Sequence, residues 1–123
     1  MCGRFVLSNY TEVNELHNVL IEPSYNIAPS HCTLIFNQEM IPEFLEWGYS
    51  PNWAKKPMNL INAKYESLGI KPSFKDYETC VFVADGWFEW KKTTTGEKQP
   101  IFIHTDQNIF YFAGIRNTSG SAI

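Results

Sequence analysis

Cysteine is scarce in this sequence. The 123 residues include three cysteines, Cys2, Cys32 and Cys80, and three histidines. An odd number of cysteines without Cys-x-x-Cys spacing argues against a disulfide framework, and the histidines do not stand at metal-ligand spacing either. We therefore predict a protein of a reducing compartment that needs no metal and no cofactor.

Long apolar runs and an excess of positive charge are missing as well. No stretch approaches the roughly 20 apolar residues of a membrane span, and the N-terminus lacks the apolar core of a signal peptide. These absences predict a soluble intracellular protein without membrane attachment. Lys and Arg total 10 against 13 Asp and Glu, for a net charge of −3. If the chain binds nucleic acid, its positive charge must be concentrated locally.

Apolar and β-favouring residues are plentiful. Hydrophobic residues make up 44% and aromatic residues 15% of the chain. Helical spacing predicts a helix over residues 12–20, capped by Asn9 or Thr11, and a second short helix over residues 62–68. The pattern as a whole predicts an α+β fold, mainly antiparallel β-sheet with a few short helices. Alternating and β-branched runs predict strands at residues 2–7, 32–37, 42–47, 79–85, 87–92, 100–104 and 109–115.

The connections are predicted from their turn residues. Residues 25–30 are expected to form an extended loop because Pro29 disfavours the helical region for the residue before it. Residues 48–60 carry two prolines and are expected to be irregular. The last two strands are expected to form a hairpin around residues 106–108. Residues 116–123 are small and polar, and no element that closes the sheet is expected there.

Cys2 has a chemical capability that depends on its position. Met1 is removable because Cys2 is small, and its removal would leave an α-amine and a thiol on adjacent carbons. Both groups are partly reactive near neutral pH. The amine can form a Schiff base with an aldehyde, and the thiol can then close a thiazolidine ring. The alternative, which position alone favours, is an ordinary small residue in a first strand.

Two further polar residues stand among apolar neighbours. Glu89 lies between Phe88 and Trp90, and partial desolvation by these rings would help its carboxyl group donate and accept protons at neutral pH. Strand alternation could equally turn Glu89 to solvent. Asn62 could orient an amine or a developing oxyanion, but such a residue is more often a turn or cap residue.

Aromatic and basic side chains supply candidates for contacts with a nucleic-acid strand. Exposed aromatics stack on bases, although core packing is the commoner fate of a tryptophan. Most lysines and arginines are simply solvated, so each one is weak support by itself. The aromatic candidates are Trp47, Tyr49, Trp53 and Trp90. The phosphate-contact candidates are Arg4, Lys55, Lys56, Lys64 and Arg116.

Short motifs that follow one another along the whole chain resemble the SRAP family, the SOS-response-associated peptidases. The first of these motifs is the N-terminal Met-Cys-Gly-Arg-Phe at residues 1–5. The other segments, in order, are Tyr-Asn-Ile-Ala-Pro at 25–29, Trp-Gly-Tyr-Ser-Pro at 47–51, Ile-Asn-Ala-Lys-Tyr-Glu at 61–66, Ala-Asp-Gly-Trp-Phe-Glu-Trp-Lys at 84–91, Lys-Gln-Pro at 98–100 and Phe-Ala-Gly-Ile at 112–115.

The resemblance implies a barrel-like SRAP fold and a role in the DNA damage response. Family members bind single-stranded DNA and link covalently to abasic sites through a thiazolidine, which shields the lesion. The implied setting is the cytoplasm, with nucleoid association during action. The implied catalytic residues are Cys2, Asn62 and Glu89. The implied DNA-binding residues are Arg4, Pro29, Trp53, Lys64 and Trp90, where Lys64 replaces the usual arginine and loses its bidentate geometry.

The resemblance also implies autocatalytic removal of Met1, the activity behind the word peptidase. The family's catalytic histidine lies in a motif beyond the matched part, and the family domain is nearly twice as long. Residues 1–123 are therefore expected to be the N-terminal part of a single SRAP domain, with exposed edges that favour self-association. Two alternatives stay open: an N-terminal-nucleophile cysteine peptidase acting on proteins, and a non-catalytic module for single-stranded or modified DNA.

Overall fold

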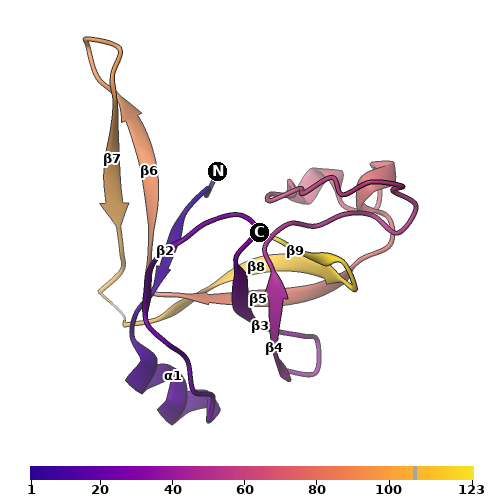
Figure 1. The fold of residues 1–123 in the computed structure, drawn as a ribbon, viewed down its shortest axis with the longest axis horizontal. Coiled ribbons are helices and arrows are strands. Elements are labelled where there is room, and N and C mark those ends of the chain that lie inside the picture. The colour runs from indigo at the N-terminus through magenta and orange to yellow at the C-terminus, as the bar shows by residue number, and fades with distance from the viewer. Residues whose placement is uncertain (107) are drawn as a thin grey trace. The chain divides into compact units, whose positions relative to one another are not determined.

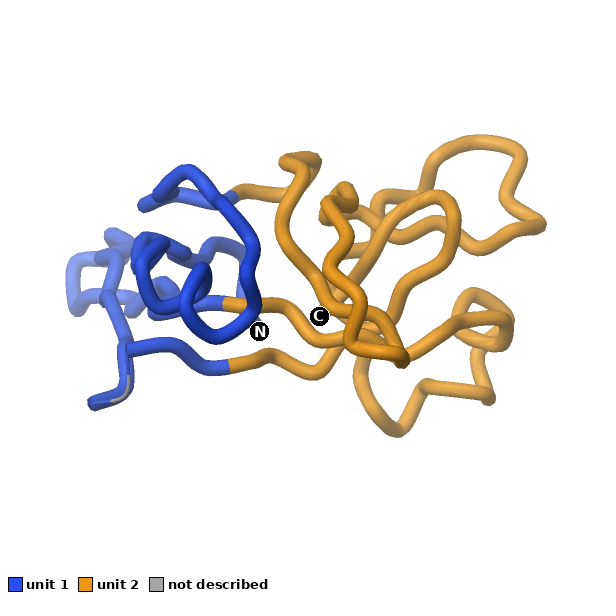
Figure 2. Tube along the Cα trace, turned by 90° about the horizontal axis from the view of Figure 1, so that it is seen from below, with its two compact units in different colours: residues 1–27, 84–110 blue, residues 28–83, 111–123 orange. Residues whose placement is uncertain are grey.

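The computed structural model describes residues 1–106 and 108–123. The chain forms two compact units (Figure 2). Unit 1 consists of residues 1–27 and 84–110, and unit 2 of residues 28–83 and 111–123. The sheets follow this division, with four strands in order β2-β1-β6-β7 and five strands in order β4-β3-β5-β8-β9 (Figure 1).

One α-helix, two 3-10 turns and nine strands are assigned within the described residues. All six strand pairings with a defined register are antiparallel, so the mainly antiparallel α+β fold is confirmed. The elements are β1 (Phe5–Leu7), α1 (Tyr10–His17), β2 (Ser24–Ile27), β3 (Cys32–Phe36), β4 (Pro42–Glu46), η1 (Tyr65–Ser67), η2 (Pro72–Phe74), β5 (Glu78–Ala84), β6 (Gly86–Lys92), β7 (Lys98–Ile103), β8 (Phe110–Asn117) and β9 (Gly120–Ala122).

In unit 1 the short, buried β1 is the centre of the sheet. Phe5 is fully buried, and it lies opposite Ile27 of β2 on one side and Trp87 of β6 on the other. Strands β6 and β7 form a hairpin of six residue pairs (Figure 1). A polar turn closes this hairpin, with Gly96 at φ +86°, a left-handed conformation that glycine adopts without strain.

Helix α1 begins two residues before the predicted start at residue 12, and it also ends early. The side chain of Asn9 accepts a hydrogen bond from the backbone N–H of Glu12 at 3.2 Å and donates one to the Glu12 carboxylate at 2.9 Å. This reciprocal cap confirms Asn9 as the helix start. The predicted end at residue 20 is wrong, because Asn18 adopts φ +54°, a left-handed conformation that terminates the helix after His17.

The carboxylate of Asp85 joins the start of this helix to the sheet of unit 1. One of its oxygens accepts hydrogen bonds from the backbone N–H groups of Ser8 and Asn9, at 2.6 and 2.7 Å, and from the Ser8 hydroxyl at 3.1 Å. The backbone N–H of Asp85 donates to the carbonyl of Val6 at 2.8 Å. Asp85 therefore holds the end of β1 against the beginning of β6.

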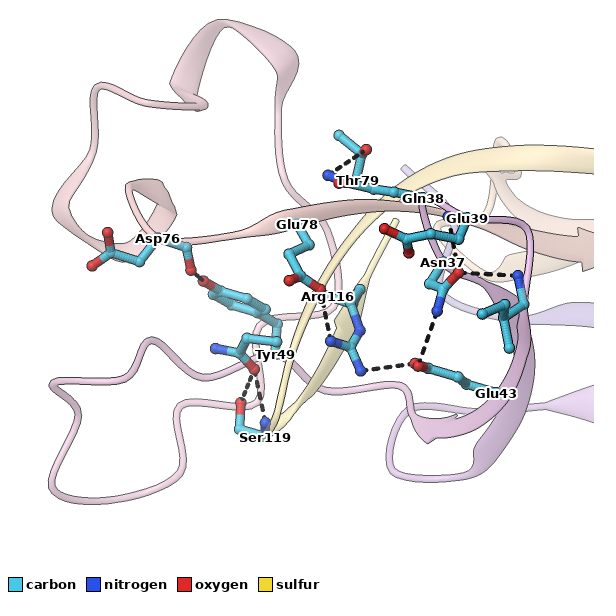
Figure 3. Close-up of polar contacts among 12 residues, drawn as sticks. Asn37, Gln38, Glu39, Glu43, Tyr49, Asp76, Glu78, Thr79, Arg116 and Ser119 are labelled. Carbon is cyan, nitrogen blue, oxygen red and sulfur yellow. Dashed lines mark hydrogen bonds and ion pairs between the residues drawn. The ribbon is translucent and has the colours of Figure 1, made fainter.

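In unit 2 the sheet is built on β3 and β5, which pair with Ile35 opposite Phe82, both fully buried. The strands predicted at residues 32–37 and 42–47 form β3 and β4, which pair as a hairpin. The side-chain oxygen of Asn37 accepts from the N–H groups of Glu39 and Ile41 at 3.0 Å to form its turn (Figure 3). Tyr49, Phe74, Ile115 and Ala122 form a buried cluster in this unit.

Strand β9 corrects the prediction that residues 116–123 contain no closing element. It pairs with β8, and Ser121 also forms a parallel bridge with Trp47. The N–H of Gly48 donates to the Ser121 carbonyl at 2.9 Å, and the Ser121 hydroxyl donates to the Glu46 carbonyl at 2.9 Å. The small residues are needed here because a Cβ on Gly120 would lie 2.2 Å from the carbonyl oxygen of Gly48.

Three other predictions need correction. Residues 24–27 form strand β2 rather than a loop, because they pair with β1. The predicted helix over residues 62–68 is a single 3-10 turn, η1. The predicted hairpin around residues 106–108 does not form among the described strands, because β7 pairs with β6 in one sheet while β8 lies between β5 and β9 in the other. Gln107, in its predicted turn, lies outside the described residues.

The described part of the chain contains one α-helix, and at eight residues it is too short to cross a bilayer.

Replacing Asp85 by alanine should destabilise unit 1. The change leaves the N–H groups of Ser8 and Asn9 without their acceptor, and each such loss typically costs about 1–3 kcal/mol. The free energy of unfolding, from urea titration followed by circular dichroism, should fall by at least that amount. Glu97→Ala, which removes an exposed carboxylate from the same unit, is the matched control and should leave it unchanged. Equal values for the two variants would contradict the structural role of Asp85.

Replacing Gly120 by alanine should destabilise unit 2. The new Cβ would meet backbone atoms of Gly48, which cannot rotate away as a side-chain tip can. We expect a loss of about 1–3 kcal/mol in the free energy of unfolding, typical of an overpacked site. In Gly3→Ala, the control, the added Cβ meets nothing within 4 Å. A Gly120→Ala variant as stable as the control would show that β9 is not held as described.

Candidate functional site

Cys2 lies at the buried end of the chain just before β1. Its side chain is 7% exposed, and its thiol donates a long hydrogen bond, 3.4 Å, to the backbone carbonyl of Arg4. Burial raises the pKa of the Cys2 thiol, and the nearby carboxylate of Glu89 raises it further. The raised pKa favours the protonated thiol at neutral pH. With Met1 in place, the nitrogen of Cys2 is an amide, so no free amine is next to the thiol.

The register of β1 and β6 brings Glu89 to the N-terminus. Phe5 lies opposite Trp87, and the N–H of Phe88 donates to the carbonyl of Arg4 at 3.0 Å, so the pairing continues one residue beyond β1. The Oε1 atom of Glu89 lies 3.9 Å from the α-ammonium of Met1, and both side chains are partly solvent-exposed.

Arg4 and Trp90 flank this pair in unit 1. The guanidinium of Arg4 donates to the side-chain oxygen of Asn26 at 3.3 Å. In the described part of the chain, no carboxylate forms an ion pair with Arg4. Trp90 is 45% exposed and lies opposite Pro100 of the edge strand β7. Asn26 is a positioning residue that the sequence analysis missed, because β2 was taken for a loop.

Asn62 belongs to unit 2, in an extended segment whose neighbours are held on both sides. The carbonyl of Ile61 accepts from the indole N–H of Trp47 at 2.9 Å and from the N–H of Ile123 at 3.0 Å. The N–H of Ala63 donates to the carbonyl of Ile123 at 2.7 Å. The backbone at Asn62 is therefore fixed by β9 and its continuation, and Asn62 precedes the turn η1 rather than beginning a helix.

Trp53, Lys64 and Pro29 lie at turns of unit 2. Trp53 is 56% exposed, and its indole N–H donates to the carbonyl of Pro72 at 3.1 Å. Lys64 is exposed just before η1. Pro29 precedes Ser30, whose φ of +70° makes a tight turn closed by a 3.1 Å hydrogen bond from the N–H of His31 to the carbonyl of Ala28.

The structure gives Arg116, one of the phosphate-contact candidates, a different role. Its guanidinium bridges two carboxylates, Glu43 at 2.7 Å and Glu78 at 2.8 Å (Figure 3). Burial lowers the pKa of Arg116, but the hydrogen bond and charge of Glu78 and the charge of Glu43 outweigh that effect and raise it. Arg116 thus joins β8 to β4 and β5, and its charge is neutralised within unit 2.

Four of the predicted site residues, Cys2, Arg4, Glu89 and Trp90, come together through one strand pairing in unit 1. The other four, Pro29, Trp53, Asn62 and Lys64, are carried by unit 2. Trp47 and Tyr49, named as stacking candidates, are fully buried and belong to the core of unit 2. The sequence pattern could not separate them from Trp53 and Trp90, because an aromatic side chain is suited both to core packing and to base stacking.

The burial of Cys2 predicts how the three free cysteines react while Met1 is present. Cys32 is exposed, whereas Cys2 and Cys80 are buried, and burial raises the pKa of Cys80 from 9.0 to about 12. Only the thiolate reacts, so the reactive fraction of Cys80 at neutral pH is roughly a thousandfold below normal. Iodoacetamide should modify Cys32 first, then Cys2 and Cys80 far more slowly, as measured by peptide mass spectrometry.

In guanidinium chloride the three cysteines should react at similar rates, which controls for local sequence effects. Modification of Cys2 in the folded chain as fast as Cys32 would contradict its burial.

Comparison with known proteins identifies the family. Residues 1–122 match the family model described as SOS response associated peptidase (SRAP). The abasic site processing protein YoqW of Bacillus subtilis is 37% identical over 133 residues, which covers 94% of this chain and 59% of that protein. The abasic site processing protein YedK of Escherichia coli is 34% identical over 138 residues, with 96% and 60% covered.

The fold agrees with this relationship. The crystal structure of a phage-related protein from Bordetella bronchiseptica matches 93% of this chain and 60% of its own, with a TM-score of 0.69 and 29% sequence identity. The chain thus spans about 60% of the length of these relatives. Because the family model matches nearly every residue, the chain belongs to the SRAP family.

Proposed function

We propose that this chain processes abasic sites in DNA, and that Cys2, freed of Met1, links covalently to the lesion in single-stranded DNA. The observation that carries the proposal is the strand register of unit 1. It sets the carboxylate of Glu89 beside the N-terminus and next to Cys2, in a chain whose relatives are named abasic site processing proteins. Hydrolysis of the Met1–Cys2 peptide bond consumes one water, releases methionine and exposes the α-amine of Cys2.

The reaction then follows from ordinary aldehyde chemistry. The amine of Cys2 attacks the aldehyde carbon of the ring-opened abasic sugar, and loss of one water gives an imine. The thiolate of Cys2 adds to the same carbon while the imine nitrogen takes up a proton. A carbon–sulfur bond closes the thiazolidine, and no oxidant or reductant is needed. One residue supplies both nucleophiles, which an internal cysteine cannot do.

Glu89 is the proton-transfer group in this proposal. Its carboxylate lies 3.9 Å from the ammonium of Met1, one residue from the amine that removal of Met1 would expose on Cys2. In the proposal Glu89 accepts the proton that must leave this amine before it attacks. It can return that proton to the leaving hydroxyl during imine formation. The partly exposed position of Glu89 lets a sugar reach the same carboxylate.

The remaining predicted residues have binding roles. We assign Arg4 and Lys64 to backbone phosphates, because neither has an ion-pair partner within residues 1–106 and 108–123. Trp53 and Trp90 offer exposed rings on which bases stack. Asn62 supplies a hydrogen-bonding amide for the sugar, and Pro29 shapes its turn for the strand. Each role is tested by the alanine variant in the assay below.

The test uses the chain with Met1 removed, confirmed by intact mass, and a single-stranded oligonucleotide with one abasic site. A heat-stable, slowly migrating band should form on a denaturing gel, and Cys2→Ala should abolish it. Glu89→Gln should slow band formation about 100-fold, the lower range of general acid–base contributions. Glu97→Gln, which neutralises an exposed carboxylate of the same unit, should have no effect.

A covalent band in Cys2→Ala would overturn the mechanism. Cleavage of unrelated peptides in trans, without a DNA adduct, would instead favour a cysteine peptidase. Equal, salt-sensitive binding of intact and abasic strands without a covalent product would favour a non-catalytic binding module.

A further inference from the structure

The loop of residues 50–59 in unit 2 is a closed and ordered structure. Its base is the antiparallel bridge of Tyr49 and Leu60, whose N–H groups donate to each other's carbonyls at 2.8 Å. Inside the loop, the hydroxyl of Ser50 accepts from the N–H of Met58 at 2.8 Å. These contacts set the loop's conformation before any ligand is present.

The turn between β8 and β9 holds this loop from outside. The side-chain amide of Asn117 donates to the carbonyl of Ser50 at 2.7 Å, and the hydroxyl of Ser119 donates to the same carbonyl at 2.7 Å. The N–H of Ser50 in turn donates to the hydroxyl of Ser119 at 3.1 Å. The loop is therefore attached to the sheet through one carbonyl group and one N–H group.

A polar cavity of about 420 Å³ lies between the loop and this turn. Since one water occupies about 30 Å³ of liquid, the cavity has room for a small anion and several waters. Its charged lining consists of Lys55, Lys56 and Glu46, a net excess of one positive charge. Within the described residues, neither lysine has an ion-pair partner. Asn52 and Asn59 add side-chain amides to the lining.

We propose that this cavity binds a backbone phosphate of the DNA strand, with Lys55 and Lys56 supplying the charge. The inference rests on the proposed function in so far as the ligand is DNA. A phosphate suits the cavity because lysine binds phosphate as a point charge, and the lining amides donate hydrogen bonds to its oxygens. The unfavourable net charge of −3 makes such a local cluster necessary for binding a polyanion.

The position of Trp53 supports the same ligand. Trp53 stands between two residues that line the cavity, Asn52 and Ala54, and is itself 56% exposed. Its indole N–H is held by the carbonyl of Pro72, which fixes the ring. One short loop thus presents a stacking surface for a base and a cationic cavity for a phosphate, the two features that a single strand offers together.

Glu46 makes the proposal testable in both directions. Its carboxylate opposes anion binding in the cavity, so Glu46→Gln should strengthen binding, whereas Lys55→Gln with Lys56→Gln should weaken it. The matched control is the double variant Lys71→Gln with Lys75→Gln, which removes two exposed lysines from unit 2 outside the cavity.

Binding of an intact oligothymidylate without an abasic site is measured by fluorescence anisotropy over a series of NaCl concentrations. Loss of one phosphate contact should reduce the slope of log K against log salt by about 0.7 in the Lys55/Lys56 variant. Affinity at low salt should fall several-fold relative to the Lys71/Lys75 control. A slope and affinity equal to those of the control would overturn the proposal.

A second arm separates DNA from free phosphate. Inorganic phosphate is titrated and the backbone amide signals of Asn59 and Ser119 are followed by NMR. Suppose that these signals shift on addition of phosphate to the wild-type chain, but that the Lys55/Lys56 variant binds DNA as tightly as the control. The cavity is then a site for free phosphate, and the assignment to DNA is wrong. The covalent assay with the abasic oligonucleotide separates this inference from the proposed function. If the Lys55/Lys56 variant binds DNA more weakly but the wild-type chain forms no covalent adduct, the proposed function alone is refuted. If the wild-type chain forms the adduct but the Lys55/Lys56 variant binds DNA as well as the control, this inference alone is refuted.

Discussion

The pairing of β1 with β6 is the constraint on which the N-terminal site depends. Strand β1 is three residues long, too short to hold its register by its own ladder. The Asp85 carboxylate compensates by accepting from the N–H groups of Ser8 and Asn9 just beyond the strand. It thereby sets the register that places Phe5 opposite Trp87 and brings Glu89 to the N-terminus. A shift of one residue in the pairing of β1 with β6 would turn the side chain of Glu89 to the opposite face of the sheet.

In the proposed scheme, the same pairing keeps Cys2 inactive while Met1 is attached. Burial holds the thiol of Cys2 protonated, and the peptide bond to Met1 removes its amine. Removal of Met1 would place a new ammonium one residue deeper in the site. In the proposal Glu89 takes the proton of this new ammonium, because its carboxylate lies 3.9 Å from the nitrogen of Met1, the residue joined directly to Cys2. In this scheme, stability and activity depend on the same short strand.

Unit 2 shows how an irregular segment acquires a defined conformation. Residues 47–63 take part in two isolated bridges rather than a strand, and β9 and its continuation form backbone hydrogen bonds with Gly48, Ile61 and Ala63. Close approach of backbone to backbone at Gly120 and Gly48 makes this possible. The arrangement fixes Asn62 and, through Asn117 and Ser119, the loop that carries Trp53 and the two lysines.

Local patterns were sufficient for the predicted antiparallel class, the cap at Asn9, the β3–β4 hairpin and the order of the motifs that indicate the family, because each depends on neighbouring residues. They could not predict β2 and β9, or that β8 lies between β5 and β9 rather than beside β7, because these pairings depend on partners far along the chain. The chemistry available to Cys2 follows from its place next to Met1. Its burial, its proximity to Glu89 and the neutralisation of Arg116 by Glu43 and Glu78 arise from tertiary contacts, since desolvation and charge pairing depend on what surrounds a group in space.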